Sequence, residues 1–483
     1  KNAIIVDSKS NHHFQKKDIL IEFGVIKKIE NDIKVKDEKV ISFKNLHVSK
    51  GWFDSSVSFG EPGYEERETI ENGLRTSSKS GFTDIILNPN TNPVIDSHSS
   101  VSHIYKKTNK SATKVHVLGS LTKQSLGIEI AELYDMHIAG AIAFGDYKKT
   151  LNNTNIMKIA LDYVQSFDGL IMSYPCEYNL SKEGLMHEGK ISLNLGLKGI
   201  PEIAETSILS RDLEVLEYTN GRIHFPFISC EKSLNMIRSA KKKGLKVTCG
   251  VSIAHLFFTE NSLLSYNPNF KIFPPLRTKK DREALRNGLL EGTIDLVSSM
   301  HEPINIENKK VEFSKAIDGS IGLESFFGIL NSIFTLEKTI SFLTNGKDLF
   351  KINTSKLEVG KKASLTMFCP DTTYELKEEH IISKSKNCAF INSNTAIKST
   401  TIDIREVEFS IIFRKLARPF NSSKSTKSRN RSRNRIRSTT SSFVNSFSGR
   451  RSITSRSIST KEFVVTVSKP VGNTNSGGDT SRR

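Results

Sequence analysis

Short apolar runs, broken by glycine and polar clusters, fill the first 50 residues and predict β-strands joined by turns. Ile4–Val6 and Ile19–Phe23 are two of these runs. Strand-like runs return in the segment 355–390. The two blocks therefore predict one small β module, with residues 1–50 as its first part and 355–390 as its second.

Between these blocks, strand-like runs alternate with segments of helical periodicity. Leu209–Glu217 and Ser233–Lys241 show the helical pattern, with apolar residues three and four apart. Eight strands are expected, at 52–59, 82–88, 115–120, 141–146, 169–174, 222–228, 246–252 and 293–299. Eight strands alternating with helices over about 250 residues are typical of a (β/α)8 barrel, although a doubly wound sheet produces a similar pattern. We expect this α/β domain to cover residues 51–354.

The formal net charge of +18 is concentrated at one end of the chain. Residues 391–483 hold 19 Lys and Arg against 5 Asp and Glu, which leaves 51 basic and 47 acidic residues in 1–390. Residues 421–460 contain 14 Ser and 10 Lys or Arg and no acidic residue. Such a segment buries too little apolar surface to offset its ordering entropy, so we expect 391–483 to be a disordered, low-complexity basic tail. A nucleic-acid partner is supported only through this tail.

The cysteines and the apolar runs limit the class of protein. Five cysteines occur, none of them at CxxC spacing: Cys176, Cys230, Cys249, Cys369 and Cys388. The odd number favours free thiols in a reducing compartment over a disulfide framework or a zinc knuckle. No run of about 18 apolar residues occurs, so no membrane-spanning helix is expected. These features predict a cytoplasmic protein without a membrane partner.

Motifs at the expected strand ends occur in an order that resembles one known family. They are Gly51–Gly63, Leu87–Pro93, Leu195–Glu205, Phe273–Asp281, Gly292–His301 and Ser383–Asn387. Together they resemble the dihydroorotase family of the amidohydrolase superfamily, and most closely its long bacterial type, which pairs with aspartate transcarbamoylase. The resemblance runs from about residue 2 to about residue 390. It implies a distorted (β/α)8 TIM barrel with a small β-sandwich built from both ends of the barrel chain.

The resemblance also implies a metal-dependent reaction, the hydrolysis of the cyclic amide dihydroorotate to carbamoyl aspartate. One or two divalent metals, usually zinc, supply hydroxide and polarise the carbonyl, and imidazole and carboxylate groups hold them. At the family's metal-ligand positions this sequence has Ser56, Ser58, Asp146, Tyr174, Phe227 and Met300. Only Asp146 keeps a suitable side chain, so no catalytic zinc or other cofactor is expected. A new metal pair of His224 and His255 is a less favoured alternative.

The family's catalytic and substrate positions are altered as well. Met300 occupies the position of the general base, so no residue is assigned as catalytic. Gly60 stands where the family has an arginine for the substrate carboxylate, and Ile304 stands where it has a histidine. Asn90 is retained as a remnant of the substrate pocket. We therefore do not expect hydrolysis of dihydroorotate.

Two functions remain open for the barrel. The first, which we favour, is a structural or assembly role in pyrimidine biosynthesis beside aspartate transcarbamoylase, with further copies of the chain as a second kind of partner. The second is an active cyclic-amide hydrolase with an altered site, using Asp146, Tyr174, Cys176 and His301. For the segment after Phe390, the product of a shifted reading frame is the alternative to a genuine tail.

Overall fold

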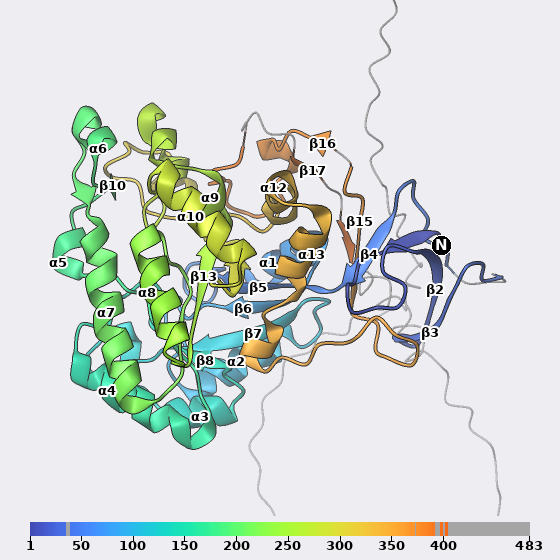
Figure 1. Cartoon of the computed structure of the whole chain (residues 1–483), viewed down its shortest axis with the longest axis horizontal. Helices are drawn as coiled ribbons and strands as arrows, with labels where there is room; N and C mark the ends of the chain where they lie inside the picture. Colours follow the sequence, from blue (N-terminus) through green and yellow to red (C-terminus); the bar gives the residue numbers. More distant parts are fainter. Residues whose placement is uncertain (35–38, 372, 392–396, 399–400, 404–483) are drawn as a thin grey trace, which may run out of the picture. The chain divides into compact units, whose positions relative to one another are not determined.

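Eight parallel strands form the central sheet of the computed structural model, in the order β5-β6-β7-β8-β9-β12-β13-β14 (Figure 1). They are β5 (Trp52–Val57), β6 (Phe82–Leu87), β7 (Lys114–Gly119), β8 (Ala143–Phe144), β9 (Ile171–Met172), β12 (Ile223–Phe225), β13 (Val247–Ser252) and β14 (Leu296–Ser298). All eight overlap the ranges expected from the sequence. The structure describes residues 1–34, 39–371, 373–391, 397–398 and 401–403.

The first and last strands close this sheet into a barrel. Val57 forms a parallel bridge with His301, and the Ser58 backbone N–H donates to the carbonyl of His301 at 2.8 Å. The Ser298 hydroxyl donates to Asp54 Oδ1 at 2.6 Å across the same seam. A doubly wound sheet keeps two open edges, whereas these contacts join the edges. The (β/α)8 barrel is therefore confirmed.

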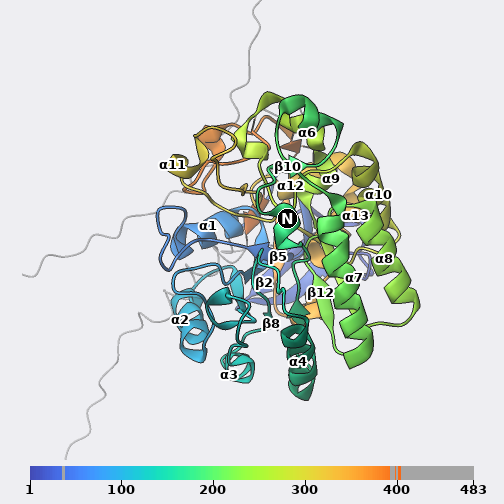
Figure 2. The same cartoon turned by 90° about the vertical axis from the view of Figure 1, so that its left-hand side faces the viewer.

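Helices surround the barrel strands (Figure 2). They are α1 (Ile70–Lys79), α2 (His98–Thr108), α3 (Leu133–Ile138), α4 (Thr154–Val164), α7 (Glu202–Thr219), α8 (Glu231–Lys242), α9 (Ile253–Phe257), α10 (Lys279–Leu290), α11 (Ile306–Lys309), α12 (Phe326–Ile333) and α13 (Leu336–Thr344). Apolar residues at helical spacing define the face that packs inward. In α4, for example, Ile156, Ala160 and Val164 lie four residues apart and are buried.

A short insertion separates β9 from α7. It contains α5 (Tyr178–Ser181), β10 (Met186–His187), α6 (Lys190–Leu195) and β11 (Gly199–Ile200). The strands β10 and β11 pair in parallel with each other. Because the insertion follows the carboxyl end of β9, it belongs to the βα loops, the side of a barrel that carries active sites.

The small β module is built from both ends of the barrel chain, as expected. Its six-stranded sheet has the order β18-β15-β4-β1-β2-β3. The strands are β1 (Ala3–Ile5), β2 (Lys16–Glu22), β3 (Val25–Glu30), β4 (His47–Lys50), β15 (Leu365–Phe368) and β18 (Thr401–Asp403). Side chains of β15 alternate between two surroundings. Leu365 and Met367 join the core of the module, whereas Phe368 packs on Trp52 of the barrel at a ring distance of 5.4 Å.

Two described strands lie inside the segment that we expected to be a tail. β17 (Ile397–Lys398) pairs with β16 (Thr373–Tyr374), and β18 pairs with β15. The module therefore continues past the boundary expected at residue 390. Residues 404–483, which carry most of the basic tail expected from the sequence, lie outside the described residues. Among the described helices, none is both long and apolar enough to cross a membrane.

Candidate functional site

The positions identified at the strand ends meet at one mouth of the barrel, as parallel strands require. Their side chains are all buried: Ser56, Ser58, Asp146, Tyr174, Phe227 and Met300. Ser56 lies in β5, and the other five follow the carboxyl ends of β5, β8, β9, β12 and β14. Tyr174 packs against Phe227 with ring centroids 6.3 Å apart. Small hydroxyls and large apolar or aromatic side chains thus line the place where a barrel enzyme carries its catalytic groups.

The two serines form a neutral hydrogen-bond network with two asparagines after β6. Asn88 Nδ2 donates to Ser56 Oγ at 3.1 Å and to Ser58 Oγ at 3.0 Å. Ser58 Oγ in turn donates to Asn90 Oδ1 at 3.0 Å. Asn90, which we expected to be a remnant of a substrate pocket, therefore contacts Ser58 and helps to hold the network together.

Asp54 lies inside the barrel and joins β5 to β14. Its carboxylate accepts hydrogen bonds from the Ser298 hydroxyl at 2.6 Å and from the backbone N–H groups of Ser56 and Ser299, both at 3.2 Å. Complete burial raises the pKa of Asp54 to about 6, and the bonds from Ser298 and Ser299 only partly oppose that rise. The side chain is thus a buried acid that links the first strand to the last.

Asp146, which we expected to be the one carboxylate kept at a ligand position, is hydrogen-bonded to the loop after β7. It accepts bonds from Ser120 Oγ at 2.6 Å and from the backbone N–H groups of Leu121 at 2.9 Å and Thr122 at 3.0 Å. The Thr122 hydroxyl donates to its second oxygen. These four hydrogen bonds hold the loop after β7 against Asp146, so the carboxylate has a structural role.

Two tyrosines fill the space beside the serines. Tyr147 and Tyr174 meet edge to face with ring centroids 5.4 Å apart. Burial and the nearby charge of Glu302 raise the pKa of both phenols well above the ordinary value, so both hydroxyls are protonated at neutral pH. In the sequence, Tyr147 carries no signal of its role except that it directly follows Asp146 at a strand end.

Met300 and His301 follow β14 but do not provide a general base. Met300 is buried and adopts a left-handed backbone conformation, with φ of 51°. His301 accepts a bond from the Gly322 N–H at Nδ1 over 3.3 Å. Burial lowers the pKa of His301 to about 3, so the imidazole is neutral at pH 7.

Gly60 and Ile304, which the resemblance places at the positions of an arginine and a histidine, carry neither a cationic nor an imidazole side chain. Gly60 has φ of 123°, and a Cβ atom there would lie 2.5 Å from the carbonyl oxygen of Tyr64. This turn therefore favours glycine and opposes any side chain. Ile304 is buried, and its backbone N–H donates to Asn387 Oδ1 at 3.1 Å.

The residues at the mouth do not fit a catalytic zinc ion. Within the described residues, no three His, Cys, Asp or Glu side chains come together to hold a metal. His224 bonds to Thr248 at 2.9 Å, whereas His255 bonds to Ser252 at 2.8 Å and to the Pro274 carbonyl at 3.1 Å. A zinc site needs about four converging nitrogen, sulfur or oxygen donors, and hydroxyl, phenyl and thioether groups do not replace them.

The residue set of the altered-enzyme alternative is not joined into a catalytic group. In the described part of the chain, no hydrogen bond links any two of Asp146, Tyr174, Cys176 and His301. Burial raises the pKa of Cys176 to about 11, so its thiol is protonated at neutral pH and is a weak nucleophile. No nucleophile therefore stands beside a base in this set.

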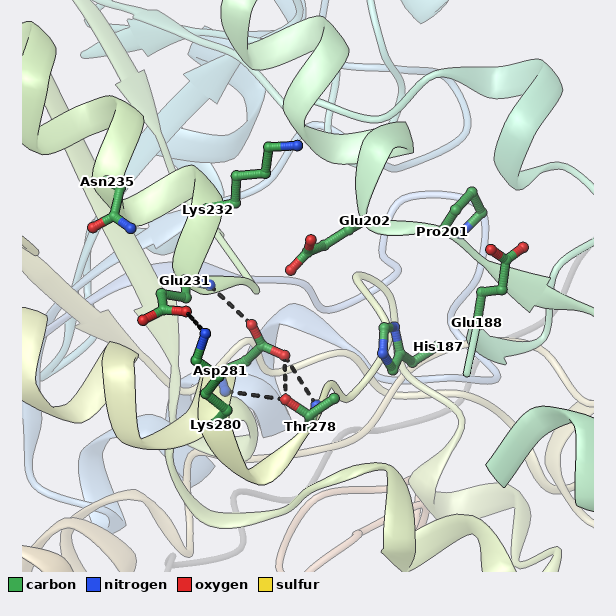
Figure 3. Close-up of a pocket in the computed structure, with 10 residues that line it drawn as sticks. All are labelled: His187, Glu188, Pro201, Glu202, Glu231, Lys232, Asn235, Thr278, Lys280 and Asp281. Atoms are coloured by element: carbon green, nitrogen blue, oxygen red, sulfur yellow. Dashed lines mark hydrogen bonds and ion pairs between the residues drawn. The ribbon is translucent and has the colours of Figure 1, made fainter. Parts of the chain in front are cut away.

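A pocket of about 620 Å³ lies apart from these positions, at the first turns of α7, α8 and α10 (Figure 3). It is lined by His187, Glu188, Pro201, Glu202, Glu231, Lys232, Asn235, Thr278, Lys280 and Asp281. Arg277 donates to His187 Nδ1 at 3.0 Å, and burial together with that charge lowers the pKa of His187 to about 4. No local sequence pattern predicts this pocket, and the charges of its lining are mixed. Glu231, for example, pairs with Lys280 at 2.6 Å.

The chain matches a family model described as "Dihydro-orotase-like" over residues 47–233. It is 36% identical over 400 residues to a protein of Ruminiclostridium cellulolyticum named dihydroorotase, covering 81% of this chain and 93% of that protein. It is 37% identical over 401 residues to a protein of the same name from Caldicellulosiruptor saccharolyticus, with the same coverage.

Solved structures of low sequence identity share the fold. The L-hydantoinase (dihydropyrimidinase) from Arthrobacter aurescens aligns with a TM-score of 0.71 at 20% identity, over 83% of this chain and 92% of that one. The dihydropyrimidinase from Brevibacillus agri aligns with a TM-score of 0.69 at 18% identity, over 83% and 91%. At these identities the likeness concerns the fold alone.

Proposed function

The chain belongs to the dihydroorotase family of the amidohydrolase superfamily, and on this basis we propose that it is a family member without catalytic activity. Its role is structural, in the cytoplasm, as a partner of aspartate transcarbamoylase in pyrimidine biosynthesis or of further copies of itself. The barrel supplies a folded surface for that assembly. The reaction of its relatives is not retained.

The observation that carries this proposal is the content of the barrel mouth. Hydroxyl, aromatic and thioether side chains fill five of the six positions where the family holds metal, and all are buried. The sixth, Asp146, accepts hydrogen bonds from four donors of the loop after β7. Without a metal, no group of the mouth generates hydroxide near neutral pH. The folded barrel around such a site supports a role in assembly.

Two measurements on the full-length chain test the proposal. The first is a dihydroorotate hydrolysis assay in the presence of zinc, with the Ruminiclostridium cellulolyticum relative as the positive control. We expect turnover indistinguishable from buffer. The second is multi-angle light scattering of the chain alone and mixed with aspartate transcarbamoylase. A larger complex or a stable oligomer supports the assembly role, and a monomer without affinity for the transcarbamoylase contradicts it.

A second candidate is an active cyclic-amide hydrolase with an altered site. The identity of 36% to a protein named dihydroorotase favours it. The same hydrolysis assay separates the two candidates. Zinc-dependent turnover of dihydroorotate or of a related cyclic amide would support the active hydrolase and refute the proposal that the chain is inactive.

A further inference from the structure

A long loop, residues 302–320, follows β14 at the barrel mouth, and its two ends are held together. The Glu302 N–H donates to the Ser320 carbonyl at 2.9 Å, and His301 forms a parallel bridge with Ser320. The short helix α11 lies inside this β14 loop. Because the loop leaves the barrel and returns to it at one place, its middle can open without unfolding a barrel strand.

Two buried lysines fasten the middle of the β14 loop to the segment that precedes α10. Lys309 Nζ donates to the carbonyls of Ile317 at 2.9 Å and of Lys271 at 3.2 Å. Lys271 Nζ donates to the carbonyls of Ala316 at 2.7 Å and of Ser314 at 3.0 Å. The two lysines are only 3% and 6% exposed. We call Lys309, Lys271 and the four carbonyls that they bind the lysine clasp.

The lysine clasp has no counter-charge in direct contact. No carboxylate oxygen of the described residues lies within ion-pair distance of Nζ of Lys309 or Lys271. A lysine ammonium carries three N–H donors, whereas each of these side chains has two carbonyl acceptors. Burying an unpaired charge with an unsatisfied donor is costly, whereas a neutral amine has two N–H donors and is satisfied by two carbonyls. The geometry of the clasp therefore disfavours protonation.

The charged groups that face the clasp do not offset this effect of burial. Burial lowers the pKa of Lys309 from 10.5 to about 7. Asp318 and Glu302 act against this fall, whereas Lys148 and Lys271 add to it. Burial also lowers the pKa of Lys271, against the charge of Asp318. Once the loop opens, each amine meets water and regains its ordinary pKa, so protonation favours the open loop.

We propose that the lysine clasp makes the β14 loop a pH-sensitive gate at the barrel mouth, closed at alkaline pH and increasingly open as pH falls towards neutral. The open loop binds the proton of Lys309 more tightly than the closed loop. The closed form therefore gains stability as pH rises from about 7 to about 10, and its stability is constant below that range. One proton changes the opening equilibrium by about tenfold per pH unit within the range. The proposal holds whether or not the chain is an enzyme.

Hydrogen–deuterium exchange of the full-length chain between pH 7 and pH 9 tests the proposal. Exchange is read by mass spectrometry and corrected for the intrinsic effect of pH on exchange. The N–H groups of Ile317 and Gly319 report the closed loop, because they donate to the carbonyls of Asn308 at 3.1 Å and of Lys271 at 3.0 Å. We expect their protection to fall by about 50-fold from pH 9 to pH 7.

Two neighbouring lysines provide the variant and its control. Lys309→Met removes the titrating amine, so protection of the loop should be lower at pH 9 and should no longer change with pH. Lys310→Met replaces the exposed lysine beside it and should keep the native profile. Native protection that is constant from pH 7 to pH 9 would overturn the proposal, as would a native-like fall in Lys309→Met. If Lys309→Met does not fold, the native profile decides alone.

Discussion

Asp54 should make the stability of the barrel depend on pH between about 4 and 6. The side chain is fully buried, and its pKa is raised from 3.8 to about 6. Asp54→Asn is a suitable perturbation because the amide oxygen can take the place of Oδ1, which accepts the bonds from Ser298 and Ser56. The variant keeps the shape of the side chain and removes its charge.

The sign and size of the effect follow from the two pKa values. The folded state holds the proton more tightly than the unfolded state, so the stability contributed by this proton is fully present below about pH 4 and is lost as pH rises to about 6. A difference of about two pKa units corresponds to about 3 kcal/mol. The variant does not titrate, so its stability relative to the native chain should increase by about that amount between pH 4 and pH 7.

Urea unfolding of both proteins at several pH values measures this difference. The comparison with the variant is necessary because other buried groups act in the opposite direction. The pKa values of His224 and His301 are both lowered to about 3, so the neutral histidines lose stability as pH falls below their ordinary value near 6.5. These terms are shared by the two proteins and cancel. A difference that stays constant from pH 4 to pH 7 would refute the reasoning about Asp54.

Three further predictions concern single substitutions measured by thermal unfolding. Lys347→Met should lower the free energy of unfolding by about 3–5 kcal/mol, because Lys347 is buried and pairs with Asp84 at 2.7 Å. The control Lys351→Met should change Tm little, because both side chains of the pair that it removes are more than half exposed. Equal effects of the two substitutions would contradict the argument from burial. Gly60→Ala should lower stability by about 1–3 kcal/mol, since φ there is 123°, and an unchanged Tm would show that the turn is not strained. Asp146→Asn should lower stability by about 1–2 kcal/mol through its lost hydrogen bonds and leave the zinc content unchanged; a fall in bound zinc would identify a live metal ligand.

The barrel strands were predictable because each buried strand leaves a local apolar run. The closure of the barrel was not, since Val57 and His301 meet only in the folded chain. The end of the β module was also missed. β18 is a strand of three residues, too short to leave a clear apolar pattern, and its place depends on pairing with β15.

At the site, the sequence indicated which metal ligands are absent, but not how the side chains that replace them pack and form hydrogen bonds. Tyr147 adjoins Asp146 in the chain, yet only the fold shows that its ring packs on Tyr174. The hydrogen bonds of Asp146 were equally hidden, because they come from a loop more than twenty residues earlier in the chain. The raised pKa of Asp54 results from burial against β14, which no local pattern contains.

The zinc content of the full-length protein tests the central claim most directly. The purified chain is incubated with excess zinc, desalted and analysed by inductively coupled plasma mass spectrometry, beside a relative that carries the family's histidine pair in its first barrel strand. If the barrel mouth holds no catalytic metal, zinc remains far below one ion per chain, and Asp146→Asn does not alter it. Retention of one or two zinc ions per chain, lost in Asp146→Asn, would contradict the account.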